Sequence, residues 1–179
     1  YWNIFATYNT SESFKEFIKE YKNVEAIKLD LTKSNIPKFN KIDVILYLVG
    51  ISPALDDGKK IHGLSQMDFL HAKAVSLILE NVKGFSKFIY FSSGIYYLLN
   101  NFSSYRKSRM LGEAMVSLTA QSNNFDYLII RNMEIYGDYM PKHKIYRKIC
   151  ESALNNVDEL NFMGDGNNFV DTMYIDDYI

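Results

Sequence analysis

Cysteine, histidine and long apolar runs are scarce in this sequence. Its single cysteine, Cys150, excludes an internal disulfide bond and a zinc site made of several cysteines, and it is expected to pack as a small buried residue on a helix. His62 and His143 have no acidic or histidine neighbour at ligand spacing, so no metal site is predicted. No run approaches the roughly 20 apolar residues of a membrane span, and no charged-then-apolar leader opens the chain. We therefore expect a soluble protein of the reducing cytoplasm, with no membrane contact.

An excess of charge of one sign is also lacking. The 20 lysine and arginine residues nearly balance the 21 aspartate and glutamate residues, which leaves a formal net charge of −1, and no basic block stands out. A nucleic-acid-binding surface is therefore not predicted. The 179 residues are 47% apolar and 23% charged, and these values are typical of one globular domain with a substantial core.

Short apolar runs alternate with amphipathic segments along the chain. Strands are predicted at residues 2–8, 24–29, 42–49, 88–93 and 125–131. Helices are predicted at residues 13–21, 65–83, 106–121 and 146–154, and the buried side of the second is expected to carry Phe69, Ala72, Val75, Leu79 and Val82. The run at 42–49 is almost unbroken, so this strand is expected to be parallel and buried on both faces. The alternation predicts an α/β fold with a doubly wound parallel sheet.

Residues 88–113 carry the groups with the clearest chemical meaning. Ser92 and Ser93 end a predicted strand, where their hydroxyls would lie at its carboxyl edge. Tyr105 and Arg109 are four residues apart, which places a phenol and a cation on one face of a helix. A serine, a tyrosine and a cation can together polarise a carbonyl and move its proton. The alternative interpretation is an ordinary exposed helix pair beside the end of a strand.

This segment resembles the catalytic segment of the extended short-chain dehydrogenase/reductases, the NAD-dependent epimerase/dehydratase family, with its Ser-Ser-x-x-Val-Tyr-Gly and Tyr-x-x-x-Lys motifs. The resemblance assigns the family's serine to Ser93 and its tyrosine to Tyr105. The family's lysine, which holds the nicotinamide ribose and stabilises the phenolate, falls on Arg109, whose planar fork directs its donors differently. Lys107 is nearby in sequence but faces away from Tyr105 on a helix. The resemblance thus implies an NAD(P)-dependent epimerase, dehydratase or reductase with an altered Ser/Tyr/Arg site.

The ends of the earlier strands are expected to contact the cofactor, because ligands of doubly wound sheets bind outside the carboxyl ends of the strands. The resemblance matches residues 28–32 to the family's adenine-binding strand end and residues 48–50 to its turn beneath the cofactor. Residues 6–11 contain neither an acid nor a base, and their amide and hydroxyl groups favour NADP over NAD. The expected cofactor-binding residues are Asn9, Asp30, Leu31, Leu48, Val49, Gly50, Tyr105 and Arg109.

Two later segments resemble the family's substrate-binding motifs. Residues 131–137 match Arg-Pro-x-Asn-Val-Tyr-Gly with the asparagine replaced by Glu134, and residues 164–177 match Gly-Asp-Gly-x-x-x-Arg-Asp-x-x-Tyr-Val-Asp-Asp with the arginine replaced by Val170. A carboxylate repels a diphosphate, and valine cannot supply a bidentate fork. The implied substrate is a sugar or nucleotide sugar held near Ser93, Glu134 and Val170, in an altered pose.

Other departures from the family leave a second function open. The family's Gly-x-x-Gly-x-x-Gly phosphate turn does not occur in the sequence. We therefore expect residues 1–179 to be an NAD(P)-binding Rossmann-like domain that lacks about 20 to 30 upstream residues and part of a C-terminal substrate lobe. His71 replaces a family asparagine and either touches the cofactor side or packs in the core. A cofactor-binding module with a sensing or assembly role and decayed chemistry is the alternative function. Family members usually dimerise through the catalytic helices, so a homodimer is compatible with both.

Overall fold

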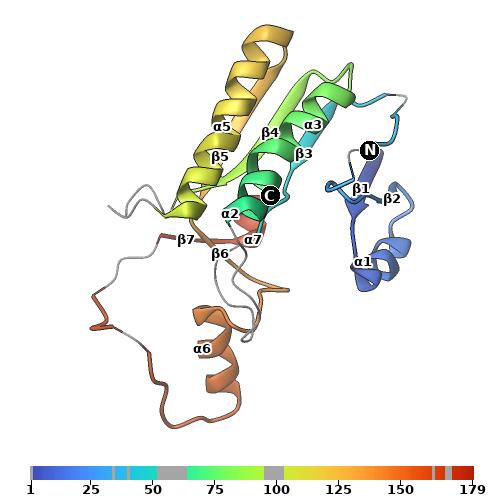
Figure 1. The fold of residues 1–179 in the computed structure, drawn as a ribbon. Helices are drawn as coiled ribbons and strands as arrows, with labels where there is room; N and C mark the ends of the chain where they lie inside the picture. Colours follow the sequence, from blue (N-terminus) through green and yellow to red (C-terminus); the bar gives the residue numbers. More distant parts are fainter. Residues whose placement is uncertain are drawn as a thin grey trace.

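The computed structural model describes residues 2–33, 35–39, 41–51, 64–94, 103–162, 164–167 and 171–179 (Figure 1). The strands are β1 (Ile4–Tyr8), β2 (Val24–Lys28), β3 (Val44–Tyr47), β4 (Lys87–Ser93), β5 (Asp126–Asn132), β6 (Glu134–Tyr136) and β7 (Thr172–Tyr174). The helices are α1 (Glu12–Phe17), α2 (Leu64–Asp68), α3 (Ala74–Asn81), α5 (Ser104–Asn123), α6 (Ile145–Leu154) and α7 (Ile175–Tyr178). A 3₁₀ turn (Ile18–Glu20) follows α1, and a π-helical turn (Phe69–Lys73) joins α2 to α3.

All strand pairs in the described part of the chain are parallel. β1 pairs with β2, β4 lies between β3 and β5, and β6 pairs with β7. No ladder among these residues joins β1 to β3, yet Leu29 and Leu31, just after β2, belong to the same buried cluster as Tyr47 of β3. The strands are thus parallel and joined through helices, as predicted for a doubly wound α/β fold.

The core lies between the β3–β4–β5 sheet and the helices above it. Figure 1 shows α3 and α5 side by side over this sheet, where the two helices contact each other and α5 contacts β4 and β5. The residues of β4 alternate in burial, so Phe88, Tyr90 and Ser92 face these helices. The buried cluster consists of Leu29, Leu31, Tyr47, Ala74, Val75, Ile78, Leu79, Val82, Phe88, Tyr90 and Val116. This packing fixes α5 against the carboxyl end of β4.

The prediction that the strand at 42–49 is buried on both faces is wrong. β3 is parallel to β4, as expected, but Leu46 is 56% exposed and Leu48 is 67% exposed. The reason is that, among the described residues, the helices that pack on this sheet lie on its other face, where Tyr47 is buried. An apolar run alone does not tell whether both faces have a covering layer.

The helix predicted at 65–83 is interrupted by the π-helical turn. Val75, Leu79 and Val82 are buried as expected, whereas Phe69 and Ala72 are only partly buried. The wider turn rotates the buried side of the helix, so His71 and Ala74 are the fully buried residues there. The imidazole of His71 is therefore part of the buried side of this helix.

Helix α6 differs from its prediction in burial. It carries Cys150 as expected, but the cysteine is exposed, because none of the residues of α6 is buried. In Figure 1 this helix lies apart from the β3–β4–β5 sheet. Among the described residues, no helix combines the length and the apolar character that crossing a bilayer requires.

Candidate active site

The start of α5 sets the position of the predicted tyrosine and arginine. Ser103 caps the helix, since its hydroxyl accepts a hydrogen bond from the Arg106 backbone N–H at 3.2 Å. Tyr105 then lies in the first turn and Arg109 one turn later. The Arg109 Nε donates to the Tyr105 hydroxyl at 3.2 Å, and the guanidinium lies 5.3 Å from the centre of the phenol ring. Arg109 is only 8% exposed, so the two do not form an ordinary exposed helix pair.

Arg109 also joins the helix to the ends of two strands. Its Nη1 donates to the carbonyl of Phe91 at 3.0 Å and to the carbonyl of Val49 at 3.4 Å. A Cβ atom at Gly50 would lie 2.9 Å from Arg109 Cζ, so the close approach of the guanidinium requires glycine there. The structure thereby brings together four of the predicted site residues: Tyr105, Arg109, Val49 and Gly50.

The two serines at the end of β4 have different surroundings. The Ser92 hydroxyl donates to Glu113 Oε1 at 2.6 Å, and Arg131 donates to the same carboxylate through Nη2 at 2.6 Å and through Nε at 3.1 and 3.2 Å. Ser92 therefore ties β4 to α5. Consecutive residues of a strand point to opposite faces, so the hydroxyl of Ser93 is directed away from this pair. Ser93 lies two residues beyond Phe91, whose carbonyl accepts from Arg109.

His71 packs in the core, which answers the question that the sequence leaves open. Its side chain is fully buried and its ring meets the Tyr105 ring edge-on, with centroids 5.3 Å apart. Its Nε2 lies 3.1 Å from the Ile51 backbone nitrogen, and its Nδ1 lies 2.7 Å from the Ser108 hydroxyl. Burial, reinforced by the charge of Arg109, lowers the pKa of His71 to about 3, so the ring is neutral.

Sequence reasoning missed Ser108 as part of this site. It lies between Tyr105 and Arg109 on α5 and is fully buried, and its hydroxyl donates to the Tyr105 carbonyl at 2.8 Å. It also missed Tyr47 and Tyr90, which have buried phenols. The sequence did indicate these two residues, because each is a tyrosine within an apolar strand. A buried tyrosine hydroxyl requires a hydrogen-bond partner.

The predicted adenosine end of the site is less clearly formed. Asp30 accepts hydrogen bonds from the Thr32 hydroxyl at 2.6 Å and from the Thr32 backbone N–H at 3.0 Å, and these bonds lower the pKa of its carboxyl group. Its carboxylate thus closes its own turn. The side chain of Leu31 packs in the core. Asn9 follows β1, and Leu48 is exposed beyond β3.

The predicted substrate residues are placed only in part. Glu134 lies on β6 and forms an ion pair with Lys144, the residue that precedes α6, with its two carboxylate oxygens 2.9 and 3.1 Å from Lys144 Nζ. A cation therefore balances the carboxylate that was expected to repel a diphosphate. Val170 and His62 lie outside the described residues. No group of three or more potential metal ligands occurs in the part of the chain that the structure describes.

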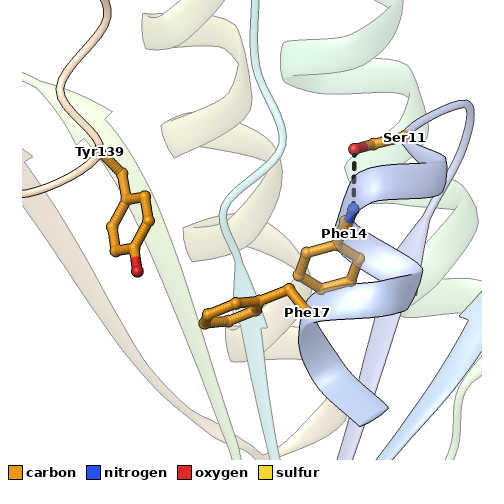
Figure 2. Close-up of a pocket in the computed structure, with 4 residues that line it drawn as sticks. All are labelled: Ser11, Phe14, Phe17 and Tyr139. Carbon is orange, nitrogen blue, oxygen red and sulfur yellow. Dashed lines mark hydrogen bonds between the residues drawn. The ribbon is translucent and has the colours of Figure 1, made fainter. Parts of the chain in front are cut away.

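An open pocket of about 400 Å³ lies away from Tyr105 and Arg109. It is lined by Ser11, Phe14 and Phe17 at α1 and by Tyr139 after β6, and Figure 2 shows the aromatic rings around it. The hydroxyl of Ser11 caps α1 by accepting from the Phe14 backbone N–H at 3.2 Å. The lining is mostly apolar and combines its one phenol with no lysine or arginine, in contrast to the pair of Tyr105 and Arg109.

Comparison with known proteins identifies the family. A sequence model of the NAD dependent epimerase/dehydratase family matches residues 2–179. A mutant UDP-glucuronic acid 4-epimerase from Bacillus cereus, solved with a substrate analogue and NAD, is 17% identical with a TM-score of 0.78, and the match covers 98% of this chain and 62% of that one. A UDP-N-acetylglucosamine 4-epimerase from Methanobrevibacter ruminantium, solved with UDP-N-acetylmuramic acid, is 19% identical with a TM-score of 0.76 and the same two coverages.

A dehydratase has the same fold. The dTDP-glucose 4,6-dehydratase DesIV from Streptomyces venezuelae, solved with NAD, is 15% identical with a TM-score of 0.75, over 97% of this chain and 59% of that one. No curated protein sequence matches the chain. The chain thus spans about three fifths of the length of these solved structures, and their likeness establishes the Rossmann-like fold. Because the family's sequence model extends over nearly all of its residues, this chain belongs to the NAD-dependent epimerase/dehydratase family.

Proposed function

We propose that this chain carries the catalytic site of an NAD(P)-dependent epimerase, dehydratase or reductase that acts on a sugar or nucleotide sugar. The observation that carries the proposal is the contact between the buried Arg109 guanidinium and the Tyr105 hydroxyl at 3.2 Å. Tyr105 exchanges a proton with a substrate hydroxyl or carbonyl, and the fixed charge of Arg109 stabilises its phenolate. Ser93, at the end of β4, holds the same substrate oxygen.

The residues around Arg109 fit the nicotinamide end of a dinucleotide. Glycine at position 50 lets the backbone after β3 lie directly against the guanidinium, which leaves main-chain groups rather than side chains at this edge. Val49, Gly50, Tyr105 and Arg109 are the residues that would hold this end. The bound cofactor supplies the hydride acceptor and donor, and the protein orients it. The glycine-rich phosphate turn does not occur in the 179 residues, so no phosphate contact is assigned.

The choice between the two dinucleotides depends on the residues after β1. Asn9, Thr10 and Ser11 offer amide and hydroxyl groups and no carboxylate for the ribose of NAD. We propose that NADP binds at least as tightly as NAD. The epimerase from Bacillus cereus and the dehydratase DesIV were solved with NAD, which favours the other dinucleotide.

The alternative function is a cofactor-binding module with a sensing or assembly role. One observation favours it: Arg109 already donates through Nε to Tyr105 and through Nη1 to the carbonyls of Phe91 and Val49. Three of its five N–H donors are thus engaged within the protein, and only those of Nη2 are left for a ribose. The same cation nevertheless remains bonded to the Tyr105 hydroxyl, and this contact favours the enzyme.

The nucleotide-sugar class is supported by the similar proteins and by the charge balance near β6. The solved epimerases bind UDP sugars. In this chain Lys144 balances Glu134, so a diphosphate near β6 meets a neutral pair rather than an isolated carboxylate. We also propose a homodimer through α5. Leu111 and Leu118 are half-exposed on this helix and lie two turns apart, so they offer an apolar surface for a second copy of the chain.

The test uses the complete protein, fluorescence titration with NADPH and NADH, and turnover of UDP-glucuronic acid, UDP-N-acetylglucosamine and dTDP-glucose. The enzyme proposal expects saturable binding of both dinucleotides and conversion of at least one sugar. Saturable binding without conversion of any sugar would support the module instead. NADH that binds about tenfold tighter than NADPH, a difference of about 1.4 kcal/mol, would contradict only the cofactor preference.

Arg109→Lys is expected to lower kcat/KM about tenfold, because one ammonium cannot reproduce the bonds of the guanidinium to the Tyr105 hydroxyl and to two strand-end carbonyls. The measurement is steady-state kinetics with the preferred dinucleotide and sugar. Arg147→Lys is the matched control, because Arg147 forms an exposed pair with Glu151 on α6 and is expected to have no effect. A gain in kcat/KM for Arg109→Lys would mean instead that arginine impairs the family's site.

A further inference from the structure

A chain of hydrogen bonds connects the loop after β3 to the first turn of α5 through one buried histidine. The Ile51 backbone nitrogen lies 3.1 Å from His71 Nε2, and His71 Nδ1 lies 2.7 Å from the Ser108 hydroxyl. The Ser108 hydroxyl in turn donates to the Tyr105 carbonyl at 2.8 Å. The imidazole therefore spans the space between the strand end beside Gly50 and the helical turn that carries Tyr105.

The chemistry of these groups determines which atom donates and which accepts in each of these hydrogen bonds. A backbone N–H can only donate, so His71 Nε2 must accept from Ile51 and carries no proton. A neutral imidazole then has its proton on Nδ1, which donates to the Ser108 oxygen. The Ser108 proton remains for the Tyr105 carbonyl. Each donor in the chain has one acceptor, and only this tautomer of His71 satisfies all three bonds.

The surroundings of the ring keep it neutral. Arg109 and Tyr105, both on α5, are the charged and titratable groups that act on the ring from that helix. Tyr90, on β4, contacts the backbone carbonyl of His71 rather than its ring. Burial and the Arg109 charge both oppose protonation, which agrees with the pKa of His71 being lowered to about 3. The tautomer is thus maintained across the pH range in which enzymes of this kind are assayed.

The backbone of His71 is held as firmly as its ring. A π-helical turn leaves carbonyls without their regular helical partners, and two phenols replace those partners here. The Tyr47 hydroxyl donates to the Leu70 carbonyl at 2.6 Å, and the Tyr90 hydroxyl donates to the His71 carbonyl at 2.9 Å. Burial raises the pKa of Tyr90 to about 12 and raises the pKa of Tyr47, so both phenols keep their protons.

The two phenols and a glycine form a matched support for this turn. Tyr47 and Tyr90 are register partners on β3 and β4, and their rings stack with centroids 5.8 Å apart at 13°. Gly112 of α5 lies over them, where a Cβ atom would be 2.7 Å from the Tyr90 ring carbon Cζ and would overlap the His71 carbonyl oxygen. The strands and the helix therefore hold the π-helical turn from both sides.

We propose that His71 is a positioning residue for the proton-transfer group: through Ser108 and Ile51 it fixes the first turn of α5 against the strand end and so holds the Tyr105 phenol at Arg109. The inference rests on the proposed function, in which Tyr105 transfers the proton. It assigns a task to the fully buried imidazole of His71. It also explains why Ser108, between the two catalytic residues, is fully buried.

The first test is spectroscopic and needs no activity. The complete protein is labelled with ¹⁵N-histidine, and the ring signals of His71 are identified by their loss in His71→Asn. The expected result is one neutral tautomer with the proton on Nδ1, unchanged between about pH 5 and pH 9. A proton on Nε2, or protonation of the ring within this range, would overturn the proposal.

The second test separates the two bonds of the ring. The amide of His71→Asn reaches the position of Nδ1 and can bond Ser108, whereas the longer amide of His71→Gln reaches the position of Nε2 and can bond Ile51. His71→Phe removes both bonds and is expected to lower kcat about 100-fold with little change in KM, while each amide restores part of the loss. Wild-type kcat in His71→Phe, or no rescue by either amide, would contradict the proposal.

A serine on the same helix supplies the matched control. Ser117 bonds the Ala114 carbonyl at 3.1 Å, the same spacing as the bond of Ser108 to Tyr105, but on the exposed side of α5. Ser108→Ala is expected to lower kcat about tenfold, and Ser117→Ala to leave it unchanged. Equal effects of the two variants would contradict the proposal. The two serine variants also keep the proposal testable if the His71 variants fail to fold.

Failure of the proposed function gives a different pattern. If the unmodified protein binds a dinucleotide but converts no sugar, kinetics cannot report on His71. The Arg109 Nε–H resonance then reports on the contact with Tyr105, and the proposal expects His71→Phe to shift it. An unchanged resonance would overturn the positioning role, whereas a shifted resonance without turnover would contradict only the enzyme proposal.

Discussion

Replacing Tyr105 with phenylalanine is expected to lower kcat about 100- to 10,000-fold, the range that general acid–base groups contribute. The substitution removes only the hydroxyl, and Arg109 keeps its bonds to the carbonyls of Phe91 and Val49. The guanidinium therefore stays in place, and the affinity for the dinucleotide is expected to change by less than about threefold. The measurement combines steady-state kinetics with fluorescence titration of the dinucleotide.

The control for this variant is a tyrosine on the same sheet. Tyr127 lies on β5 and is half-exposed, so Tyr127→Phe is expected to leave both kcat and dinucleotide affinity unchanged. If Tyr105→Phe retains the kcat of the unmodified protein, the proton is moved by another group. The proposed role of Ser93 would then also lose its basis, because it depends on a substrate oxygen placed at the Tyr105 hydroxyl.

Helical spacing was sufficient to predict that Tyr105 and Arg109 meet, because residues four apart on a helix are neighbours regardless of the rest of the fold. It was not sufficient to predict that Arg109 is buried against the ends of β3 and β4. That burial depends on how α5 lies over the strands, and hence on long-range packing around Tyr90 and Gly112. The same packing makes the contact internal, which disagrees with the alternative interpretation of an exposed helix pair.

The π-helical turn was beyond the reach of sequence periodicity. The apolar positions that were predicted within residues 65–83 fit a regular helix, and His71 is not one of them. The turn is stabilised by phenols on two other elements, Tyr47 and Tyr90, so its cause lies outside the segment. The exposure of Leu46 and Leu48 had a similar origin, because an apolar strand carries no information on which of its faces a helix covers.

Ser92 and Ser93 show what the alternation of side chains along a strand can and cannot predict. The sequence placed both at a strand end and assigned the substrate to Ser93 only through the family motif. The structure shows that Ser92 faces α5 and bonds Glu113, whereas the role of Ser93 stays a prediction. No sequence pattern indicated that Glu113 also binds Arg131, because the two lie on different elements, α5 and β5.

Arg131→Met is expected to lower the free energy of unfolding by about 2 kcal/mol, because the buried Glu113 carboxylate loses the hydrogen bonds of a guanidinium that is itself half-exposed. Glu113 is 7% exposed, and the pair is bidentate, with Nη2 at 2.6 Å and Nε at 3.1 Å from its oxygens. Methionine retains the length and apolar contacts of the arginine stem, so the loss reports mainly on the charge. The measurement is urea unfolding of the complete protein, with and without the substitution.

Two comparisons decide whether this loss comes from a buried charge. Arg147→Met removes a pair of similar length, 2.7 Å to Glu151, but the carboxylate of Glu151 is 38% exposed against 8% for that of Glu113, so a loss under about 1 kcal/mol is expected. Adding Glu113→Gln to Arg131→Met removes the unpaired charge and is expected to restore part of the stability. If the double variant is as unstable as the sum of the two single ones, the carboxylate contributes through its bond with Ser92 instead. The end of β4 that carries Ser93 would then depend on Glu113 itself rather than on the ion pair.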